Sequence, residues 1–164
     1  MSIYTDLTMV KFYILRNYNT SAAPRWLKMS LEDKSNENLK LTEHILSKRN
    51  DLNNAVAGRF YYSVFQKIKF ILLRDGFDYS GYIISLKKEE KCFSHGTIRG
   101  AVIAHITKNK KITINLNDLA AINNIDFLYK KRIAADYKDE SVSDKDVAKC
   151  MQYCGEIIDF LKKI

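Results

Sequence analysis

The sequence predicts a single all-α domain, spanning residues 1–164, built from five to seven helices. Its 164 residues can bury a core without help from metals or disulfides. One proline and six glycines argue against a turn-rich β architecture and against disorder. Apolar residues recur at helical spacing through most of the chain. Only Lys111–Asn115 alternates as a short strand would, and no second strand is evident for it to pair with.

The longest predicted helix runs from Asp51 to Asp75, and we expect it at the centre of the fold. Its apolar positions recur every four residues over about six turns: Leu52, Val56, Phe60, Val64, Ile68 and Leu72. The opposite side is largely aromatic, so we expect neighbouring helices on several sides. Arg59 falls in the middle, where a guanidinium must be paired or must face a cleft or partner. Asp51 is expected to cap the first turn, and Gly76 to follow the last.

Two stretches before this helix also have helical spacing. Apolar residues at positions 7, 10 and 14 predict a short amphipathic helix from about Tyr4 to Arg16. A loop is expected over Asn17–Pro24. The segment Asn36–Lys48 carries leucine and isoleucine residues in a helical setting and predicts a helix that leads up to the central one.

Three segments after the central helix complete the predicted fold. Thr97–Thr107 and Asn117–Ala135 each carry apolar residues at helical spacing. The last helix starts where Ser143 and Asp146 form a capping arrangement, and lysines close it where cations favour the helix dipole. The polar region Phe77–Gly96 is expected to be helical in part.

The amino-acid composition indicates which kind of partner the protein binds and in which cellular compartment it works. A net charge of +8 favours a polyanion, most simply RNA or DNA, although a soluble protein that is merely basic would have the same charge. The three cysteines include no C-x-x-C pair, which indicates a reducing compartment. No clustered His or Cys supplies metal ligands, so neither a metal nor a cofactor is expected. No stretch is long enough for a membrane span, and we expect a cytoplasmic protein.

Four clusters hold side chains that can carry chemistry. They are Gly58–Phe65 around Arg59, Ser94-His95-Gly96, Arg99 with His105, and Arg132–Tyr137 with the sequence RIAADY. A glycine-rich phosphate loop, paired carboxylates, a Gly-x-Ser-x-Gly elbow and an H-E-x-x-H metal helix are all absent from the sequence.

The order and spacing of three of these motifs resemble those of HEPN domains, specifically the small stand-alone prokaryotic branch. The motifs are Arg-aromatic-Tyr-Tyr at residues 59–62, Ser-His-Gly at 94–96 and Arg-x-x-Ala-Asp-Tyr at 132–137. The resemblance covers roughly Asn36–Ile164 and leaves residues 1–35 as an N-terminal extension. It implies an up-and-down helical bundle, often a homodimer, in toxin–antitoxin or antiviral defence systems. Many such proteins are metal-independent endoribonucleases; others bind RNA or nucleotides, or partner a small nucleotidyltransferase.

The chain departs from the catalytic members of that family. Those members carry an arginine followed, after four to six residues, by a histidine in a late helix, but residues 132–137 contain no histidine. Arg99 and His105 have the required spacing at an earlier position. Six residues at about 100° each do not bring two side chains to one face of a helix. A surface arginine and a partly buried histidine are therefore the favoured interpretation of that alternative pair.

Metal-free RNA cleavage needs a group that moves a proton and a cation that stabilises the charged phosphorane. Histidine titrates near neutral pH and arginine grips phosphate with two donors, so His95, Arg132 and Arg59 are the predicted catalytic group. Tyr62 and Tyr137 are expected to donate hydrogen bonds to the substrate.

Structural roles compete with each of these predictions. Arg132 and Asp136 are four residues apart and could form an intrahelical ion pair. Asp136 could instead pair with Arg59 across the bundle or help to bind the substrate, and His95 could cap a helix. The leading prediction is an RNA-binding protein, with cleavage left open. The alternative is a non-catalytic antitoxin or regulatory partner that acts through protein contacts.

Overall fold

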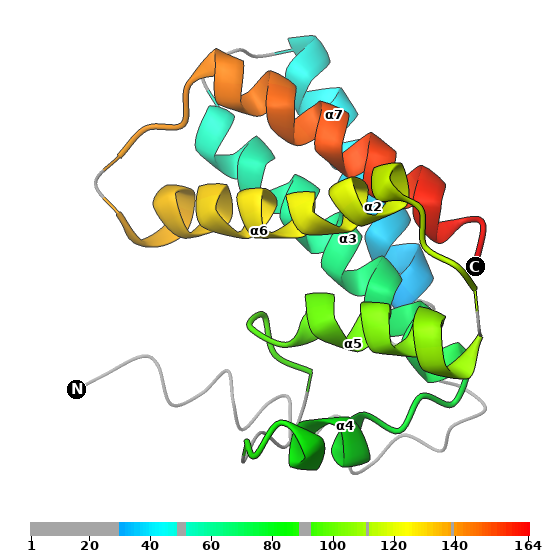
Figure 1. Ribbon diagram of the computed structural model, residues 1–164. Helices are drawn as coiled ribbons and strands as arrows, with labels where there is room; N and C mark the ends of the chain where they lie inside the picture. The colour runs from blue at the N-terminus through cyan, green and yellow to red at the C-terminus, as the bar shows by residue number, and fades with distance from the viewer. Residues whose placement is uncertain (1–29, 49–51, 89–92, 111, 139) are drawn as a thin grey trace, which may run out of the picture.

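The computed structural model describes residues 30–48, 52–88, 93–110, 112–138 and 140–164. Within these ranges the chain forms six α-helices and one π-helical turn (Figure 1). In chain order they are α2 (Leu31–Lys48), α3 (Asn53–Arg74), α4 (Tyr79–Ser85), α5 (Ile98–Ala104), η3 (His105–Asn109), α6 (Leu116–Tyr137) and α7 (Asp144–Leu161). No strand occurs in the described ranges, which confirms the all-α prediction of five to seven helices.

Helix α3 is the centre of the molecule, as its apolar spacing predicts. It packs against α2, α6 and α7 and also contacts α5 (Figure 1). The apolar stripe is buried, and the aromatic side contributes to the core as well, because Tyr61 has no exposed surface. Helices α4 and α5 lie together at the lower end of the molecule in Figure 1. The central helix therefore reaches from the α2–α7 layer down to the α4–α5 end.

Helix α2 begins five residues before the predicted start at Asn36. Ser30 caps it, since its hydroxyl oxygen accepts a hydrogen bond of 3.0 Å from the backbone N–H of Asp33. One turn in, the buried Ser35 hydroxyl donates to the Ser63 carbonyl of α3 at 2.8 Å. Two serines at this crossing let the helices approach closely. The first turns of α2 contact α3 through the Ser35–Ser63 hydrogen bond and the Glu32–Lys67 ion pair, and neither contact leaves an apolar signal in the sequence.

The predicted ends of helices are confirmed at two places. Gly76 follows α3 with a φ of 65°, the left-handed conformation expected after a helix. At the start of α7 the Ser143 hydroxyl accepts from the backbone N–H of Asp146 at 3.2 Å. Helix α6 extends two residues beyond the predicted Ala135, so Asp136 and Tyr137 belong to its last turn. These side chains therefore project from a regular helix.

The remaining expectations for the fold have different outcomes. Ile112–Asn115 is not a strand, because no neighbouring segment in the described ranges pairs with it. The helix expected over Thr97–Thr107 is α5 followed by the π-helical turn η3. Asp51, the predicted cap of α3, lies outside the described residues, as do Lys111 and the helix and loop predicted over residues 4–24. The first turn of α3 has no side-chain cap.

Cys150 and Cys154 lie on the buried face of α7, as expected for core residues. The Cys154 thiol contacts the backbone carbonyl oxygen of Phe60 at 3.7 Å. Burial raises the pKa of both thiols to about 12, so neither is a reactive thiolate at neutral pH. Separately, none of the described helices combines the length and the apolar character that crossing a membrane demands.

Candidate functional site

His95 lies against the middle of α3 and bonds to a buried tyrosine. The Tyr61 hydroxyl is 2.5 Å from His95 Nδ1, and it has no other hydrogen-bond partner in the described part of the chain. Burial is the largest influence on this hydroxyl and raises its pKa, so Tyr61 keeps its proton and shares a hydrogen bond with Nδ1 whose direction follows the His95 tautomer. The other ring nitrogen of His95, Nε2, has no hydrogen-bond partner among the described residues.

Aromatic rings from two helices hold the His95 ring in place. It stacks on Phe65 of α3, with ring centroids 4.6 Å apart, and on Tyr129 of α6, with centroids 5.6 Å apart. The Tyr62 ring stands edge-on to it at 6.3 Å. His95 therefore sits in an aromatic setting between α3 and α6 and does not cap a helix of its own.

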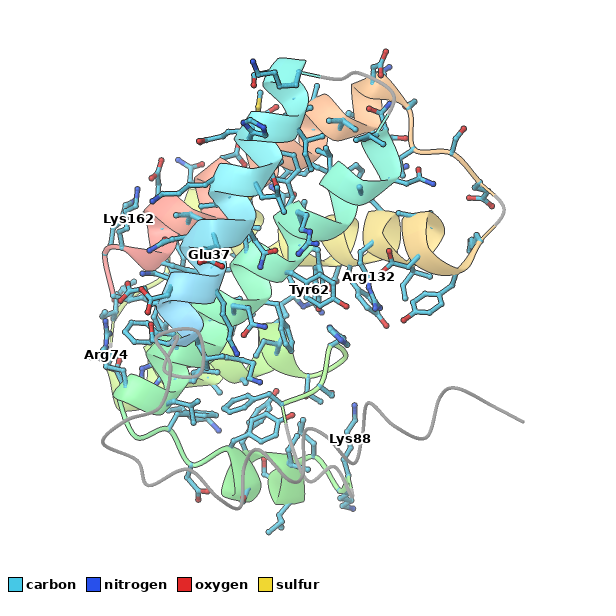
Figure 2. The ribbon with its side chains drawn as sticks, turned by 180° about the vertical axis from the view of Figure 1, so that it is seen from behind. Glu37, Tyr62, Arg74, Lys88, Arg132 and Lys162 are labelled. Atoms are coloured by element: carbon cyan, nitrogen blue, oxygen red, sulfur yellow. The ribbon has the colours of Figure 1, made fainter. Side chains whose placement is uncertain are left out.

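Arg132 of α6 approaches the same setting from the other side. Its side chain is only 7% exposed. Nη2 donates to the hydroxyls of Tyr62 at 2.7 Å and Tyr137 at 2.9 Å. The guanidinium carbon lies 5.3 Å and 4.8 Å from the centroids of those two rings, within cation–π range. Figure 2 shows Tyr62 and Arg132 side by side on one face of the molecule.

Asp136 supplies the negative charge nearest to this guanidinium. Its Oδ2 lies 2.8 Å from Arg132 Nε, four residues earlier on α6. The Nε–H does not point at the carboxylate, so the contact is an ion pair without a hydrogen bond. Nη1 makes no hydrogen bond within the described residues and is not among their buried nitrogen atoms. One edge of the guanidinium therefore remains available to a ligand.

The charges in this cluster determine which groups are ionised. Burial lowers the pKa of His95, and the positive charges of Arg132 and Lys69 lower it further. Burial also opposes the charge on Arg132, but Tyr62, Tyr137 and Asp136 outweigh it and raise the pKa of the guanidinium. At neutral pH the cluster thus contains a neutral imidazole next to a permanent cation.

Arg59 does not join the His95 cluster but lines a cavity between α2 and α3, in keeping with the expectation that it is paired or faces a cleft or partner. The side chain is exposed, and Nη1 donates to Asn38 Oδ1 of α2 at 3.1 Å. Arg59, Tyr62, Gln66 and Lys69 follow one another at helical spacing along a stripe of α3 that is not fully covered. Arg59 therefore lies one turn before Tyr62 on this stripe. Asp136 pairs with Arg132 and has no recorded contact with Arg59.

Arg99 and His105, the alternative pair, lie apart and have separate carboxylate partners. Arg99 Nη1 is 2.5 Å from Asp126 Oδ2 on the surface. His105 is buried, and its Nε2 lies 2.9 Å from Asp75 Oδ2. Arg99 is therefore a surface arginine and His105 a core histidine, and the two side chains do not form one site.

Sequence reasoning missed two residues that build the site, Tyr61 and Tyr129. Tyr61 is the third residue of the Arg-aromatic-Tyr-Tyr motif, but only its neighbour Tyr62 was predicted to contact the substrate. Tyr129 lies three residues before Arg132 and therefore shares its face of α6, a signal that was present in the sequence. No group of three or more metal-ligating side chains exists within the described ranges.

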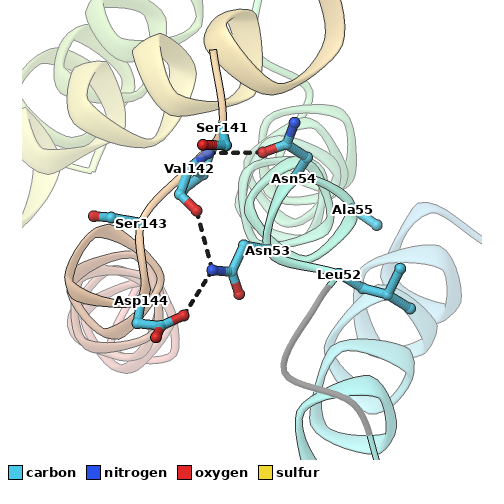
Figure 3. Close-up of a pocket in the computed structure, with 8 residues that line it drawn as sticks. All are labelled: Leu52, Asn53, Asn54, Ala55, Ser141, Val142, Ser143 and Asp144. Carbon is cyan, nitrogen blue, oxygen red and sulfur yellow. Dashed lines mark hydrogen bonds between the residues drawn. The ribbon is translucent and has the colours of Figure 1, made fainter.

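A cavity of about 670 Å³ lies elsewhere, between the N-terminal ends of α3 and α7 (Figure 3). The side-chain amides of Asn53 and Asn54 in its lining already have hydrogen-bond partners within the protein. Asn53 Nδ2 donates to the Val142 carbonyl at 3.0 Å and to Asp144 Oδ1 at 2.7 Å. Asn54 Oδ1 accepts from the Val142 N–H at 2.8 Å. These bonds tie the segment before α7 to α3, so this cavity has a structural explanation.

The side chains of the His95–Arg132 cluster are therefore suited to bind an anion next to an exposed aromatic ring. Arg132 offers charge and an open Nη1, and His95 offers the unpartnered ring nitrogen Nε2. Tyr137 is 68% exposed and presents a ring to solvent. No protein-family model, no curated protein and no solved structure matches this chain.

Proposed function

We propose that this chain is an HEPN-type RNA-binding protein of a toxin–antitoxin or antiviral defence system. In this proposal the Arg132–His95 cluster holds a phosphate of single-stranded RNA. The main support is that Tyr62 joins the two residues: its hydroxyl accepts from Arg132, and its ring stands against His95. The ring of Tyr62 thereby contacts a guanidinium and an imidazole that come from separate elements of the fold.

Single-stranded RNA fits the remaining features of the site. Arginine binds phosphate through charge-assisted hydrogen bonds, and the open edge of Arg132 is suited to that contact. The exposed Tyr137 ring offers a surface on which a base can stack. The net charge of +8 favours association with the polyanion as a whole.

Binding is better supported than cleavage. A histidine that removes the proton of a 2′-hydroxyl needs a free lone pair on a ring nitrogen. Nδ1 of His95 is hydrogen-bonded to Tyr61, which leaves Nε2 as the ring nitrogen that can meet a substrate. Residues 132–137 also lack the late-helix histidine of the catalytic pattern, so we propose retention of RNA without turnover as the primary activity.

Replacing Arg132 with glutamine is expected to weaken binding of a fluorescein-labelled single-stranded RNA about tenfold or more, since hydrogen bonds to charged groups contribute about 1.5–3 kcal/mol. The dependence of log K on log salt should become shallower by ~0.7 for the lost phosphate contact. Fluorescence anisotropy across a salt series measures both quantities. Histidine NMR should also show the pKa of His95 rising, because a neighbouring cation is removed.

Arg99→Gln is the matched control for the loss of one positive charge, because Arg99 is a surface arginine of α5 whose guanidinium is paired with Asp126. It should reproduce the wild-type affinity and salt dependence within about twofold. Equal losses of RNA affinity in the two variants would show that only the net charge of the protein matters. If Arg132→Gln bound RNA as tightly as the wild type, Arg132 would have no part in RNA binding.

The second candidate function is that of a non-catalytic antitoxin or regulatory partner, homodimer formation included. It is favoured by exposed apolar residues at the start of α6, where Leu116 is 84% exposed and Leu119 lies one turn further on. Two exposed leucines one turn apart form an apolar surface that a contact with another protein would cover. If this surface mediates protein contacts, light scattering should give a mass above that of one chain for the wild type and the single-chain mass for Leu116→Glu. A single-chain mass for both proteins would exclude self-association through Leu116.

A further inference from the structure

A second cavity lies between α2 and α3, close to the proposed RNA site. It has a volume of about 560 Å³ and is lined by Lys34, Glu37, Asn38, Lys40, Leu41, Arg59 and Gln66. This volume is within the range of pockets that bind small ligands, roughly 300–1,000 Å³. We call it the α2–α3 cavity.

Positive charge predominates in this cavity. Lys34, Lys40 and Arg59 line it, against the single carboxylate of Glu37. No ion pair within the described residues engages any of these three cations. The cavity therefore has a surplus of cations that are free to meet an anion.

Arg59 differs in this respect from the other arginines of the described ranges. Arg74, Arg99 and Arg132 each lie within 2.8 Å of a carboxylate oxygen. Arg59 makes one hydrogen bond, to the neutral amide of Asn38, and keeps four of its five N–H donors for other partners. A guanidinium left in this state at the edge of a cavity is well suited to bind phosphate.

One residue of the lining, Gln66, also carries an unsatisfied acceptor. Gln66 Oε1 is buried and has no hydrogen-bond partner in the described part of the chain. A buried carbonyl oxygen without a donor is costly, so a ligand that brings an N–H group would be favoured there. The N–H groups of nucleobases supply such a donor.

The stripe along α3 links the α2–α3 cavity to the Arg132 cluster. Arg59 and Gln66 lie one turn before and one turn after Tyr62 on the same stripe. In the view of Figure 2, Tyr62 of α3 lies between Glu37 of α2 and Arg132 of α6. A strand bound at Arg132 can therefore continue across α3 toward α2.

We infer that the α2–α3 cavity is a second nucleotide subsite for the same single-stranded RNA. Arg59, with Lys34 and Lys40, binds a phosphate distinct from the one at Arg132. Gln66 Oε1 accepts a hydrogen bond from the base of that nucleotide. The inference rests on the proposed RNA-binding function and extends it to a strand that crosses α3 from α6 to α2.

A double-mutant cycle with Arg59→Gln and Arg132→Gln tests the inference on an eight-nucleotide single-stranded RNA. Separate phosphates predict a loss of about fivefold or more in each single variant and the product of the two losses in the double variant. The salt slope should fall by ~0.7 in each single variant and by ~1.4 in the double. Arg59 is exposed, so its replacement should not affect folding, and Arg99→Gln again controls for net charge.

A strand with abasic residues tests the role of Gln66. Gln66→Leu should bind the intact RNA about threefold or more weakly than the wild type does. The two proteins should bind the abasic strand with the same affinity. Wild-type binding by Arg59→Gln, alongside weakened binding by Arg132→Gln, would overturn the inference while the proposed function stands. Absence of RNA binding by the wild type would overturn both.

Discussion

Replacing Tyr61 with alanine is expected to lower the free energy of unfolding by about 3–5 kcal/mol, the usual cost of removing a large buried ring. Tyr61 is completely buried at the centre of α3. Its ring centroid lies 5.3 Å from that of His95, 5.5 Å from that of Tyr129 and 5.8 Å from that of Phe65. The alanine variant leaves a cavity where α3, α6 and the His95 segment meet. Urea unfolding followed by far-ultraviolet circular dichroism measures the change.

Tyr61→Phe separates the ring from its hydroxyl. It retains the packing and loses the hydrogen bond to His95 Nδ1, so a loss of about 1 kcal/mol is expected. Tyr137→Ala removes an exposed ring from the same cluster and should cost less than about 1 kcal/mol, as surface replacements usually do. If Tyr61→Ala proved as mild as Tyr137→Ala, Tyr61 could not be the packing centre described above.

Asp75→Asn is expected to destabilise the protein by about 3 kcal/mol, near the lower end of the cost of removing one partner from a buried ion pair. Only 10% of the Asp75 side chain is exposed. Its carboxylate contacts Arg74 Nε at 2.7 Å and both His105 Nε2 and Lys110 Nζ at 2.9 Å. These contacts join the end of α3 to η3, so the amide would leave three donors without their anion. Urea unfolding at pH 7 measures the loss.

The effect of Asp75→Asn should depend on pH in a defined direction. The Arg74 guanidinium, followed by Lys110 and His105, holds the pKa of the Asp75 carboxyl well below its usual range. Because the pKa is lower in the folded state, the stabilisation is present above the unfolded pKa of about 3.9 and is lost as the pH falls below it. The difference between wild type and variant should therefore shrink on acidification below about pH 4.

Asp126→Asn provides the matched control for Asp75. It breaks the ion pair with Arg99, in which both side chains are well exposed, and such pairs contribute about 0–1 kcal/mol. A similar small loss for Asp75→Asn at neutral pH would show that the contacts between α3 and η3 contribute little to stability.

Local patterns predicted the helices well where their signals lie within a few residues of one another. The four-residue spacing in α3 predicted a central helix because burial on several sides requires an apolar circumference. Ser143 and Gly76 marked helix ends because capping and left-handed φ depend on one residue and its neighbours. The start of α2 was missed because Ser35 packs on Ser63, and a serine contact leaves no hydrophobic signal.

The site shows where local reasoning fails. Arg59 lies in the longest apolar helix, yet it is exposed, because neighbouring helices leave one stripe of α3 partly open. The spacing of Arg99 and His105 matched a catalytic pattern, yet two different aspartates hold them apart. His95 and Arg132 were predicted together from a resemblance. Their shared contact with Tyr62 arises from three separate segments.

By itself, the sequence determined that the described chain is helical, that Asn53–Arg74 lies at its centre and that Arg132 and Asp136 sit one turn apart. Those properties follow from the periodicity of the helix and from the chemistry of adjacent residues. Only the tertiary structure decided that Tyr61 bonds to His95, that Arg132 is surrounded by Tyr62 and Tyr137, and that Arg59 faces α2. Such contacts depend on how helices far apart in the chain pack together, and no short-range pattern in the sequence encodes that packing.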